Sequence, residues 1–445
     1  MTETPISERV STKLRRIAQL AKEDPKRSFL SLAHHVDMDL MLEAYRRTRK
    51  DGAAGVDGQT AEDFEADLDK NLKALLDGLK SGQYRAPAVK RVHIPKGDGK
   101  KTRPLGIPTF ADKVLQRAVA MVLGAVYEQD FLPCSHGFRP GRSAHQALHT
   151  LRERLMEMHG GWVLDADIQK FFDTLDHGKL REILDQRVRD GVLRRMIDKW
   201  LKAGILEDGE LSYPEEGTPQ GGVVSPLLAN VYLHEVLDTW FEREVRPRLR
   251  GSAFMVRFAD DFVIVFSSES DARRVLEVLP KRFARYGLTI HPEKTRLVRF
   301  VQPSGRQRRP NGGDDDPGPG SFDLLGFTHF WARSRRGYWV IKRKTRKSRL
   351  SRALKAIHQW CRANRHRPIK EQHRTLAAKV RGHNNYYGIT GNSESLSRFL
   401  HAVERIWKSW IGQRSQRGYL TWEQFRGIKR LYPLPLPRVR PIRVT

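Results

Sequence analysis

The feature that most constrains the fold is a pair of adjacent aspartates inside an apolar stretch. Asp260 and Asp261 lie between the runs FMVRFA and FVIVF, a pattern that predicts two buried strands joined by a tight polar turn. Two like charges about 4 Å apart repel by roughly 4 kcal/mol at an effective dielectric near 20. A chain that keeps both carboxylates at the tip of a hairpin therefore favours a divalent cation beside them.

The pair has a simpler explanation, because aspartate is also a good turn former in hairpins. A second acidic segment, also expected to be a strand, bears on whether these aspartates bind a metal or only form the turn. The segment WVLDAD places Asp165 and Asp167 on the same strand face, so spacing alone leaves open which of them would bind a metal. Hard oxygen ligands suit Mg²⁺, and two such ions could serve an in-line displacement at a phosphoryl group.

The charge of the chain is placed unevenly. The 445 residues carry a net charge of +29. Residues 331–445 hold 29 lysines and arginines against four acids, whereas the first 330 residues hold 52 basic and 48 acidic side chains. Such a cationic quarter attracts polyanions, and nucleic acid is the commonest polyanion in a cytosol. The alternatives are a basic surface without a partner and a membrane-surface binder.

Other classes of protein are excluded by composition. The chain's two cysteines, Cys134 and Cys361, lack the spacing of a zinc site or a disulfide framework. The most apolar stretch, around Val223–Leu233, is interrupted by Pro226 and Asn230, so we expect no membrane span. The start, MTETPISERV, has no secretion-signal pattern. We therefore expect a cytoplasmic, nucleoid-associated protein.

Periodicity and turn residues predict the order of the elements. The expected elements are helices within 1–85, a hairpin at 89–108 that turns at Gly97-Asp98-Gly99, a helix at 111–129, a polar loop at 135–143 that opens a helix at 144, a strand at 162–168, two strands within 254–266, a low-complexity loop at 302–321, and basic helix from about 342.

Taken in order from about residue 50 to 420, the motifs resemble the reverse transcriptases encoded by bacterial group II introns. Phe258-Ala-Asp-Asp261 is similar to the Tyr/Phe-x-Asp-Asp signature of retroviral-type polymerases. Asp167-Ile-Gln-Lys-Phe-Phe-Asp resembles the strand with the first catalytic aspartate, which selects Asp167 over Asp165. The most specific segment is GTPQGGVVSP, Gly217–Pro226. Further similar blocks are RPLGIP (103–108), SHGFRPGRS (135–143), HPEKTR (291–296) and LLGF (324–327).

The resemblance implies catalytic and substrate-binding roles. Asp167, Asp260 and Asp261 would be catalytic and would hold two Mg²⁺ ions. Lys96 and Arg103, seven apart across the hairpin turn, would supply positive charge to the triphosphate of a dNTP substrate. An exposed basic hairpin without a ligand is the alternative for these two cations.

Three more residues have roles implied by the same family. Phe172 would crowd the ribose 2′-OH and favour deoxynucleotides. Gln220 would reach the incoming nucleotide, and Lys294 would line the primer or nucleotide side. Their alternatives are a core phenylalanine, a plain loop glutamine and a solvated lysine. Phe258 replaces the commoner tyrosine, which removes one hydroxyl and should leave metal binding intact.

The implied fold is α+β, a right-hand polymerase whose fingers and palm contain antiparallel sheet, followed by a helical thumb. The expected domains are a helical N-terminal extension (1–85), reverse transcriptase fingers and palm (86–335), a thumb or maturase domain that binds RNA (336–420) and a C-terminal tail (421–445). Many relatives also carry a Cys-rich His-Asn-His endonuclease domain. The residues after Trp422 hold no cysteine pair and no histidine, so we expect that domain to be absent.

The function implied by the resemblance is RNA-directed DNA synthesis, a nucleotidyltransferase reaction, by the reverse transcriptase of a group II intron. The protein would also bind its intron RNA and assist splicing and retrohoming, with an RNA template and a DNA primer or target as further partners. Two alternatives remain, a domesticated reverse transcriptase in phage defence or CRISPR spacer acquisition and an RNA-binding splicing factor with a vestigial polymerase. The intact aspartates argue against the latter. A homodimer remains open.

Overall fold

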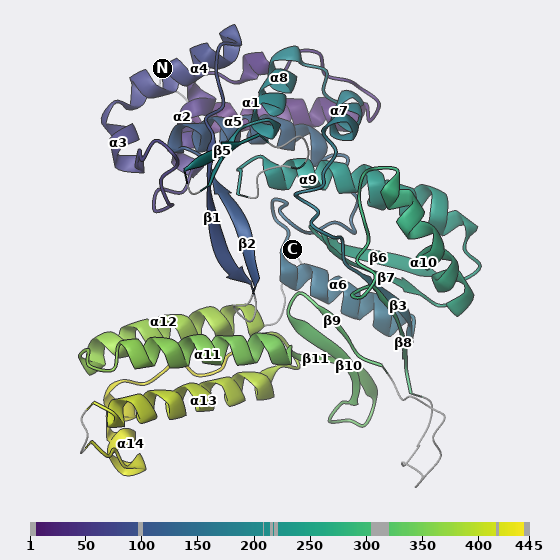
Figure 1. Cartoon of the computed structure of the whole chain (residues 1–445). Coiled ribbons are helices and arrows are strands. Elements are labelled where there is room, and N and C mark those ends of the chain that lie inside the picture. The colour runs from purple at the N-terminus through teal and green to yellow at the C-terminus, as the bar shows by residue number, and fades with distance from the viewer. Residues whose placement is uncertain are drawn as a thin grey trace. The chain divides into compact units, whose positions relative to one another are not determined.

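The computed structural model describes residues 6–96, 101–207, 209–213, 217, 221–303, 320–414 and 418–439. They form two compact units, and the chain passes between them several times. Unit 1 comprises Met1–Ser143, Ala166–Phe262 and Ser270–Arg296, and unit 2 comprises Ala144–Asp165, Val263–Glu269 and Leu297–Thr445. The mixture of helices and strands confirms the predicted α+β class (Figure 1).

Unit 1 begins with the predicted helices, α1 (Ile6–Glu23), α2 (Met38–Arg47), α3 (Ala61–Ala66) and α4 (Leu68–Ser81). The starts of α2 and α3 are set by side-chain caps. Asp37 accepts a hydrogen bond from the backbone N–H of Leu40, and Thr60 with Asp63 forms a capping box at α3. The long helix α5 (Phe110–Tyr127) packs against α1 and α2 and is buried along most of its length.

The predicted basic hairpin is confirmed. Strands β1 (Val89–Lys96) and β2 (Lys101–Ile107) pair antiparallel, from Lys90 opposite Ile107 to Lys96 opposite Lys101. Two short strands, β4 (Ile205–Glu207) and β5 (Glu210–Ser212), complete a sheet in the order β2-β1-β4-β5. The turn at Gly97–Gly99 and the side chain of Lys96 lie outside the described residues.

The strands expected around the acidic turn are present as β6 (Ala253–Phe258) and β7 (Asp261–Phe266). With β3 (Gly160–Ala166) and β8 (Arg296–Val301) they form a sheet in the order β6-β7-β3-β8. The remaining helical elements of this region are α7 (His177–Asp185), α8 (Gly191–Leu201), α9 (Ser225–Leu233), the π-helical turns η2 (His234–Thr239) and η3 (Phe241–Val245), and α10 (Glu269–Ala284).

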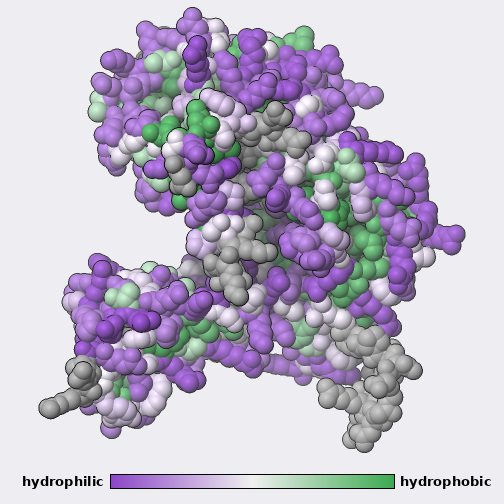
Figure 2. All heavy atoms as spheres, viewed as in Figure 1, coloured by the Kyte–Doolittle hydropathy of each residue, from purple (hydrophilic) through white to green (hydrophobic). Residues whose placement is uncertain are grey.

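Unit 2 contains α6 (Ala144–Glu157) and a sheet in the order β11-β10-β9, formed by β9 (Phe322–Leu324), β10 (Phe327–Arg333) and β11 (Trp339–Thr345). Four helices follow, α11 (Lys347–Ala363), α12 (Ile369–Tyr387), α13 (Ser393–Gly412) and α14 (Trp422–Leu431). They share a core centred on Trp407, Phe399 and Val380. The visible outer face of α11–α13 is mainly hydrophilic (Figure 2).

One expectation for the basic C-terminal quarter was wrong. Residues 342–345 lie in strand β11, and the helix begins only at Lys347. Buried Arg343 and Thr345 alternate with the more exposed Lys342 and Lys344, and a period of two is that of a strand. The expected tail also contains helix α14, whose Phe425 is buried in the shared core.

Within the described ranges, no helix is both long and apolar enough to cross a membrane. Cys134 and Cys361 are free thiols. Burial raises the pKa of the Cys361 thiol to about 12, so this thiol is protonated at neutral pH.

Candidate active site

The three predicted catalytic aspartates belong to unit 1 and lie where strands begin or end. Asp167 is the first residue after β3, and Asp261 is the first residue of β7. Asp260 lies in the turn between β6 and β7. The preceding Ala259 has a φ of +58°, a left-handed conformation that bends the chain sharply. Asp167 and Asp260 are half-buried, whereas Asp261 is exposed.

The electrostatics of Asp260 indicate that these groups are close together. Burial is the main cause that raises the pKa of Asp260, and the negative charge of Asp167 raises it further. The positive charges of Arg103 and Arg257 act in the opposite direction. The structure therefore places Arg103, on the basic hairpin, within electrostatic range of Asp260, whose carboxylate also interacts with that of Asp167.

Lys294 is brought directly to Asp167. The bridge between Ile168 and Ile290 joins two distant segments, and the backbone N–H of His291 donates to the Asp167 carbonyl at 2.7 Å. Lys294 Nζ then forms an ion pair with Asp167 Oδ2. This lysine is therefore held by the carboxylate of Asp167 and is not simply a solvated side chain.

The predicted nucleotide-binding residues are described only in part. Phe172 lies half-buried in the turn after Asp167, with its ring centroid 5.2 Å from that of Phe171 in an edge-on arrangement. Gln220 lies outside the described residues. The adjacent Gly221 has a φ of +118°, and a Cβ at this position would come within 2.2 Å of the Gly106 carbonyl oxygen. Only glycine allows the loop backbone to lie so closely against β2.

The donor set of this site is compatible with a hard divalent cation. Carboxylate oxygens are the ligands that Mg²⁺ prefers, and Asp167 and Asp260 come from different strands to one place. The raised pKa of Asp260 is the response expected of a carboxylate whose negative charge is poorly compensated. Among the described residues, no group of three or more histidine, cysteine or acidic side chains stands close enough to form a complete metal cage.

A groove of about 740 Å³ in unit 1 was not predicted from the sequence. Apolar side chains of α1 and α5 line it, together with Gly222 and Phe138. Arg47 and Arg117 also line it. Within the described part of the chain, Arg117 Nε has no hydrogen-bond partner, and burial together with the nearby charge of Arg47 lowers the pKa of Arg117. Because the lining comes from separate segments, no local motif reveals the groove.

Several known proteins are similar in sequence to this chain. The family model described as reverse transcriptase (RNA-dependent DNA polymerase) matches residues 94–329. The chain is 33% identical to the group II intron-encoded protein LtrA of Lactococcus lactis over 302 residues, 65% of this chain and 50% of that protein. It is 35% identical to protein YkfC of Escherichia coli over 58% of this chain and 75% of that protein. A third relative, 28% identical over 44% of this chain and 30% of its own length, is nuclear intron maturase 2 of Arabidopsis thaliana. The chain thus spans about half the length of the Lactococcus protein.

Proposed function

Because this chain belongs to the reverse transcriptase (RNA-dependent DNA polymerase) family, we propose that it copies an RNA template into DNA and serves a group II intron. The observation that carries the polymerase proposal is the electrostatic coupling of Asp167 and Asp260 beside Arg103. The resemblance predicted from the sequence motifs is confirmed by the similarity to the group II intron-encoded protein.

Reverse transcriptases generally use divalent metal ions, and we propose that Asp167, Asp260 and Asp261 hold two Mg²⁺ ions. When bound, these ions would supply an activated primer 3′-hydroxyl and a stabilised leaving pyrophosphate. Arg103 would hold the triphosphate through its planar fork of donors, and Lys96 would add a second positive charge.

Two residues would select and orient the nucleotide, and a third would orient a proposed metal ligand. The half-buried ring of Phe172 would leave no room for a ribose 2′-OH, so deoxynucleotides would be preferred. Gln220, the residue before Gly221, would contact the incoming nucleotide. Lys294 would keep Asp167 oriented until the cation and the substrate arrive.

The groove would receive the template strand. Arg117 lacks an acidic partner among its described contacts, so a phosphate group would supply the missing negative charge. Phe138 has 58% of its surface exposed and offers a ring for a base to stack on. The groove also shares Gly222 with the loop that would hold the nucleotide.

For residues 336–420 we propose the thumb or maturase role, in which the basic helices bind intron RNA and assist splicing and retrohoming. The support is the excess of positive charge and the exposure of Lys347, Arg352 and Lys355 along α11. Residues 86–335 would then form fingers and palm. A DNA primer or target would bind with the RNA template.

The test purifies the full chain at moderate salt, sequences the RNA that accompanies it, and assays primer extension on an RNA template. We expect one enriched structured RNA that maps around the gene, and DNA synthesis that Asp260→Ala abolishes. A diffuse RNA population with DNA synthesis that still needs Asp260 would favour a domesticated reverse transcriptase. Synthesis that survives Asp260→Ala would contradict the proposed active site.

A further inference from the structure

A fully buried ion pair lies directly before the catalytic turn. Arg257, in β6, contacts Asp238 in η2 through two hydrogen bonds, Nε to Oδ1 at 2.7 Å and Nη2 to Oδ2 at 2.6 Å. Neither side chain is exposed to solvent. Burial alone would raise the pKa of Asp238, but the charge of Arg257 holds it below its ordinary value, so the pair is ionised. Apolar residues often stabilise a fold as well as such a pair does, so stability is a weak explanation for its presence.

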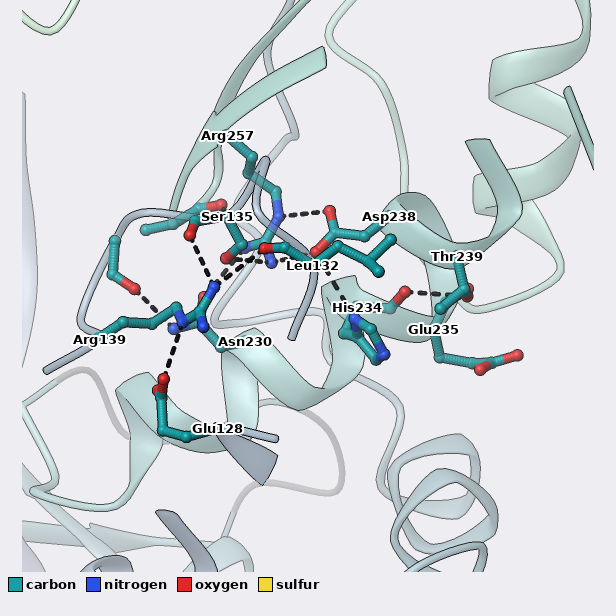
Figure 3. Close-up of polar contacts among 12 residues, drawn as sticks. Glu128, Leu132, Ser135, Arg139, Asn230, His234, Glu235, Asp238, Thr239 and Arg257 are labelled. Carbon is teal, nitrogen blue, oxygen red and sulfur yellow. Dashed lines mark hydrogen bonds and ion pairs between the residues drawn. The ribbon is translucent and has the colours of Figure 1, made fainter. Parts of the chain in front are cut away.

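The remaining donors of Arg257 reach Ser135 and Asn230 (Figure 3) and, in addition, the turn that carries Asp260. Nη1 donates to Asn230 Oδ1 at 2.9 Å and to the carbonyl oxygen of Ala259 at 3.0 Å. Nη2 also donates to Ser135 Oγ at 2.8 Å. All five N–H donors of the guanidinium are thus used, in a fixed planar geometry that only arginine provides.

Ala259 is the residue that most needs such support. Its φ of +58° is a strained conformation for a residue with a Cβ, and it persists only where the surroundings hold it. The next two residues are Asp260 and Asp261, so the direction of both carboxylates follows from the conformation of Ala259.

A loop holds the same residue from a second direction. A Cβ on Gly137 would lie 2.3 Å from the backbone nitrogen of Ala259, so this loop backbone touches the turn. Asn230 Nδ2 donates to the Gly137 carbonyl at 2.7 Å. Arg139 stiffens the loop by donating to the carbonyl of Ser135 at 2.9 Å. Asn230 therefore connects Arg257 to the loop.

The partners of Arg257 come from one helical segment and one loop. Asn230 lies in α9 and Asp238 lies in the π-helical turn η2 that follows it. Short π-helical turns occur frequently at functional sites. The backbone of Arg257 also pairs with the loop, donating to the Cys134 carbonyl at 2.8 Å and accepting from the His136 N–H at 2.9 Å.

We propose that Arg257 is a positioning residue for the polymerase reaction. Its guanidinium fixes the Asp260–Asp261 turn through the carbonyl of Ala259. The position of the guanidinium and of the turn is in turn held by Asp238, Asn230, Ser135 and Gly137. We call these residues the Arg257 network. The inference rests on the proposed catalytic role of the turn. It predicts that loss of the network weakens the use of Mg²⁺ and slows the chemical step, while primer–template binding is retained.

The test removes both charges at once, so that no unpaired charge remains buried. In Arg257→Met/Asp238→Leu we expect kcat to fall at least about 100-fold and the half-activating Mg²⁺ concentration to rise at least about tenfold. The Kd for primer–template should stay within about twofold. Arg257→Lys, in which Asp238 is retained, keeps the positive charge but lacks the five donors of the guanidinium. Its kcat should therefore remain at least about tenfold below that of the parent.

The matched control is Arg187→Met/Asp130→Leu. Arg187 is also buried, pairs with Asp130 at 2.8 Å and binds three backbone carbonyls, but it does not contact the catalytic turn. We expect its half-activating Mg²⁺ concentration to match that of the parent. If Arg257 only stabilises the fold, both double variants should show the same small change in half-activating Mg²⁺ concentration. Arg257→Lys should then be fully active.

If the double variant fails to fold, Gly137→Ala gives the second test, because it presses on Ala259 without touching the ion pair. It should show the same rise in Mg²⁺ requirement. The inference would be overturned if the folded Arg257→Met/Asp238→Leu variant, or Gly137→Ala, kept the kcat and the Mg²⁺ dependence of the parent. Asp260→Ala is assayed alongside. Activity in that variant would refute the proposed active site, whereas an inactive Asp260→Ala beside normal network variants refutes only the positioning role.

Discussion

Lys294 Nζ forms an ion pair with Asp167 Oδ2, although the two residues are 127 positions apart in the sequence. The pairing of residues 168 and 290 sets this contact, since it places the loop that carries Lys294 beside the end of β3. One carboxylate oxygen of Asp167, a proposed metal ligand, is thus already occupied by an ammonium group. A cation that binds Asp167 must compete with Lys294 for that oxygen.

Lys294→Met is therefore expected to lower the half-activating Mg²⁺ concentration. The pair is partly exposed, and such pairs contribute about 0–1 kcal/mol, so the decrease should be at most about fivefold. Lys294→Arg keeps the charge and should leave the Mg²⁺ dependence near that of the parent. The measurement is a Mg²⁺ titration of primer extension at saturating nucleotide. An increased Mg²⁺ requirement in Lys294→Met would mean that the lysine assists metal binding.

Asp260→Asn should abolish polymerization and yet raise the Tm of the metal-free protein at neutral pH. Because the folded-state pKa of Asp260 is raised, its carboxylate costs stability once the pH exceeds that pKa. Below the ordinary pKa of 3.8 the group is neutral in both states, so the cost disappears. The gain in Tm should therefore shrink as the pH falls from 8 towards 4.

The control for this prediction is Asp63→Asn. Hydrogen bonds from Thr60 lower the pKa of Asp63, so its carboxylate stabilises the fold above the ordinary pKa and that contribution is lost as the pH falls. Asp63→Asn should lower the Tm at neutral pH. Thermal unfolding in EDTA across this pH range measures both variants, and a Tm loss in Asp260→Asn would contradict the assigned cost of burial.

Those parts of the site whose residues are close together along the chain could be predicted from the sequence. The acidic turn was predictable because two apolar runs flank Asp260, and the basic hairpin because its strands adjoin one turn. The contact of Lys294 with Asp167 and the shell around Arg257 were not, since their partners come from distant segments and no spacing rule relates them. Residues 342–344 are all basic, so the alternation between buried and exposed side chains is not visible in the hydrophobic pattern. A strand was therefore predicted as helix.

Phe172→Ala should increase ribonucleotide incorporation. The half-buried ring packs edge-on against Phe171 and is expected to fill the space that a 2′-OH would need. Its removal should reduce the preference for dGTP over GTP by at least about tenfold, measured as the ratio of kcat/KM values. Phe172→Tyr retains the ring and should retain the preference. An unchanged ratio in Phe172→Ala would assign the ring to the core.

RNA binding by the basic helices should depend strongly on salt. If about 6–10 phosphates are neutralised, affinity should fall roughly 10³–10⁵-fold between 50 and 200 mM salt. The exposed Lys355 on α11 would contribute about one unit to the slope of log Kd against log salt, so Lys355→Ala should reduce that slope by about 1. Lys73→Ala, on an exposed face of α4, is the control and should leave the slope unchanged. Equal slopes in both variants would remove α11 from the RNA interface.

Phe425→Ala should destabilise unit 2, although Phe425 lies in the segment that the sequence suggested was a tail. The side chain is fully buried and meets the edge of Trp407, at a centroid distance of 5.7 Å. Removing a buried phenylalanine side chain typically costs about 3–5 kcal/mol, because the cavity left behind collapses only in part. Phe425→Leu conserves most of the apolar volume and should cost much less. Hydrogen exchange of α13 in the full chain measures both variants, with increased exchange expected for Phe425→Ala. Equal protection in Phe425→Ala and the parent would show that α14 adds nothing to the stability of the core that it contacts.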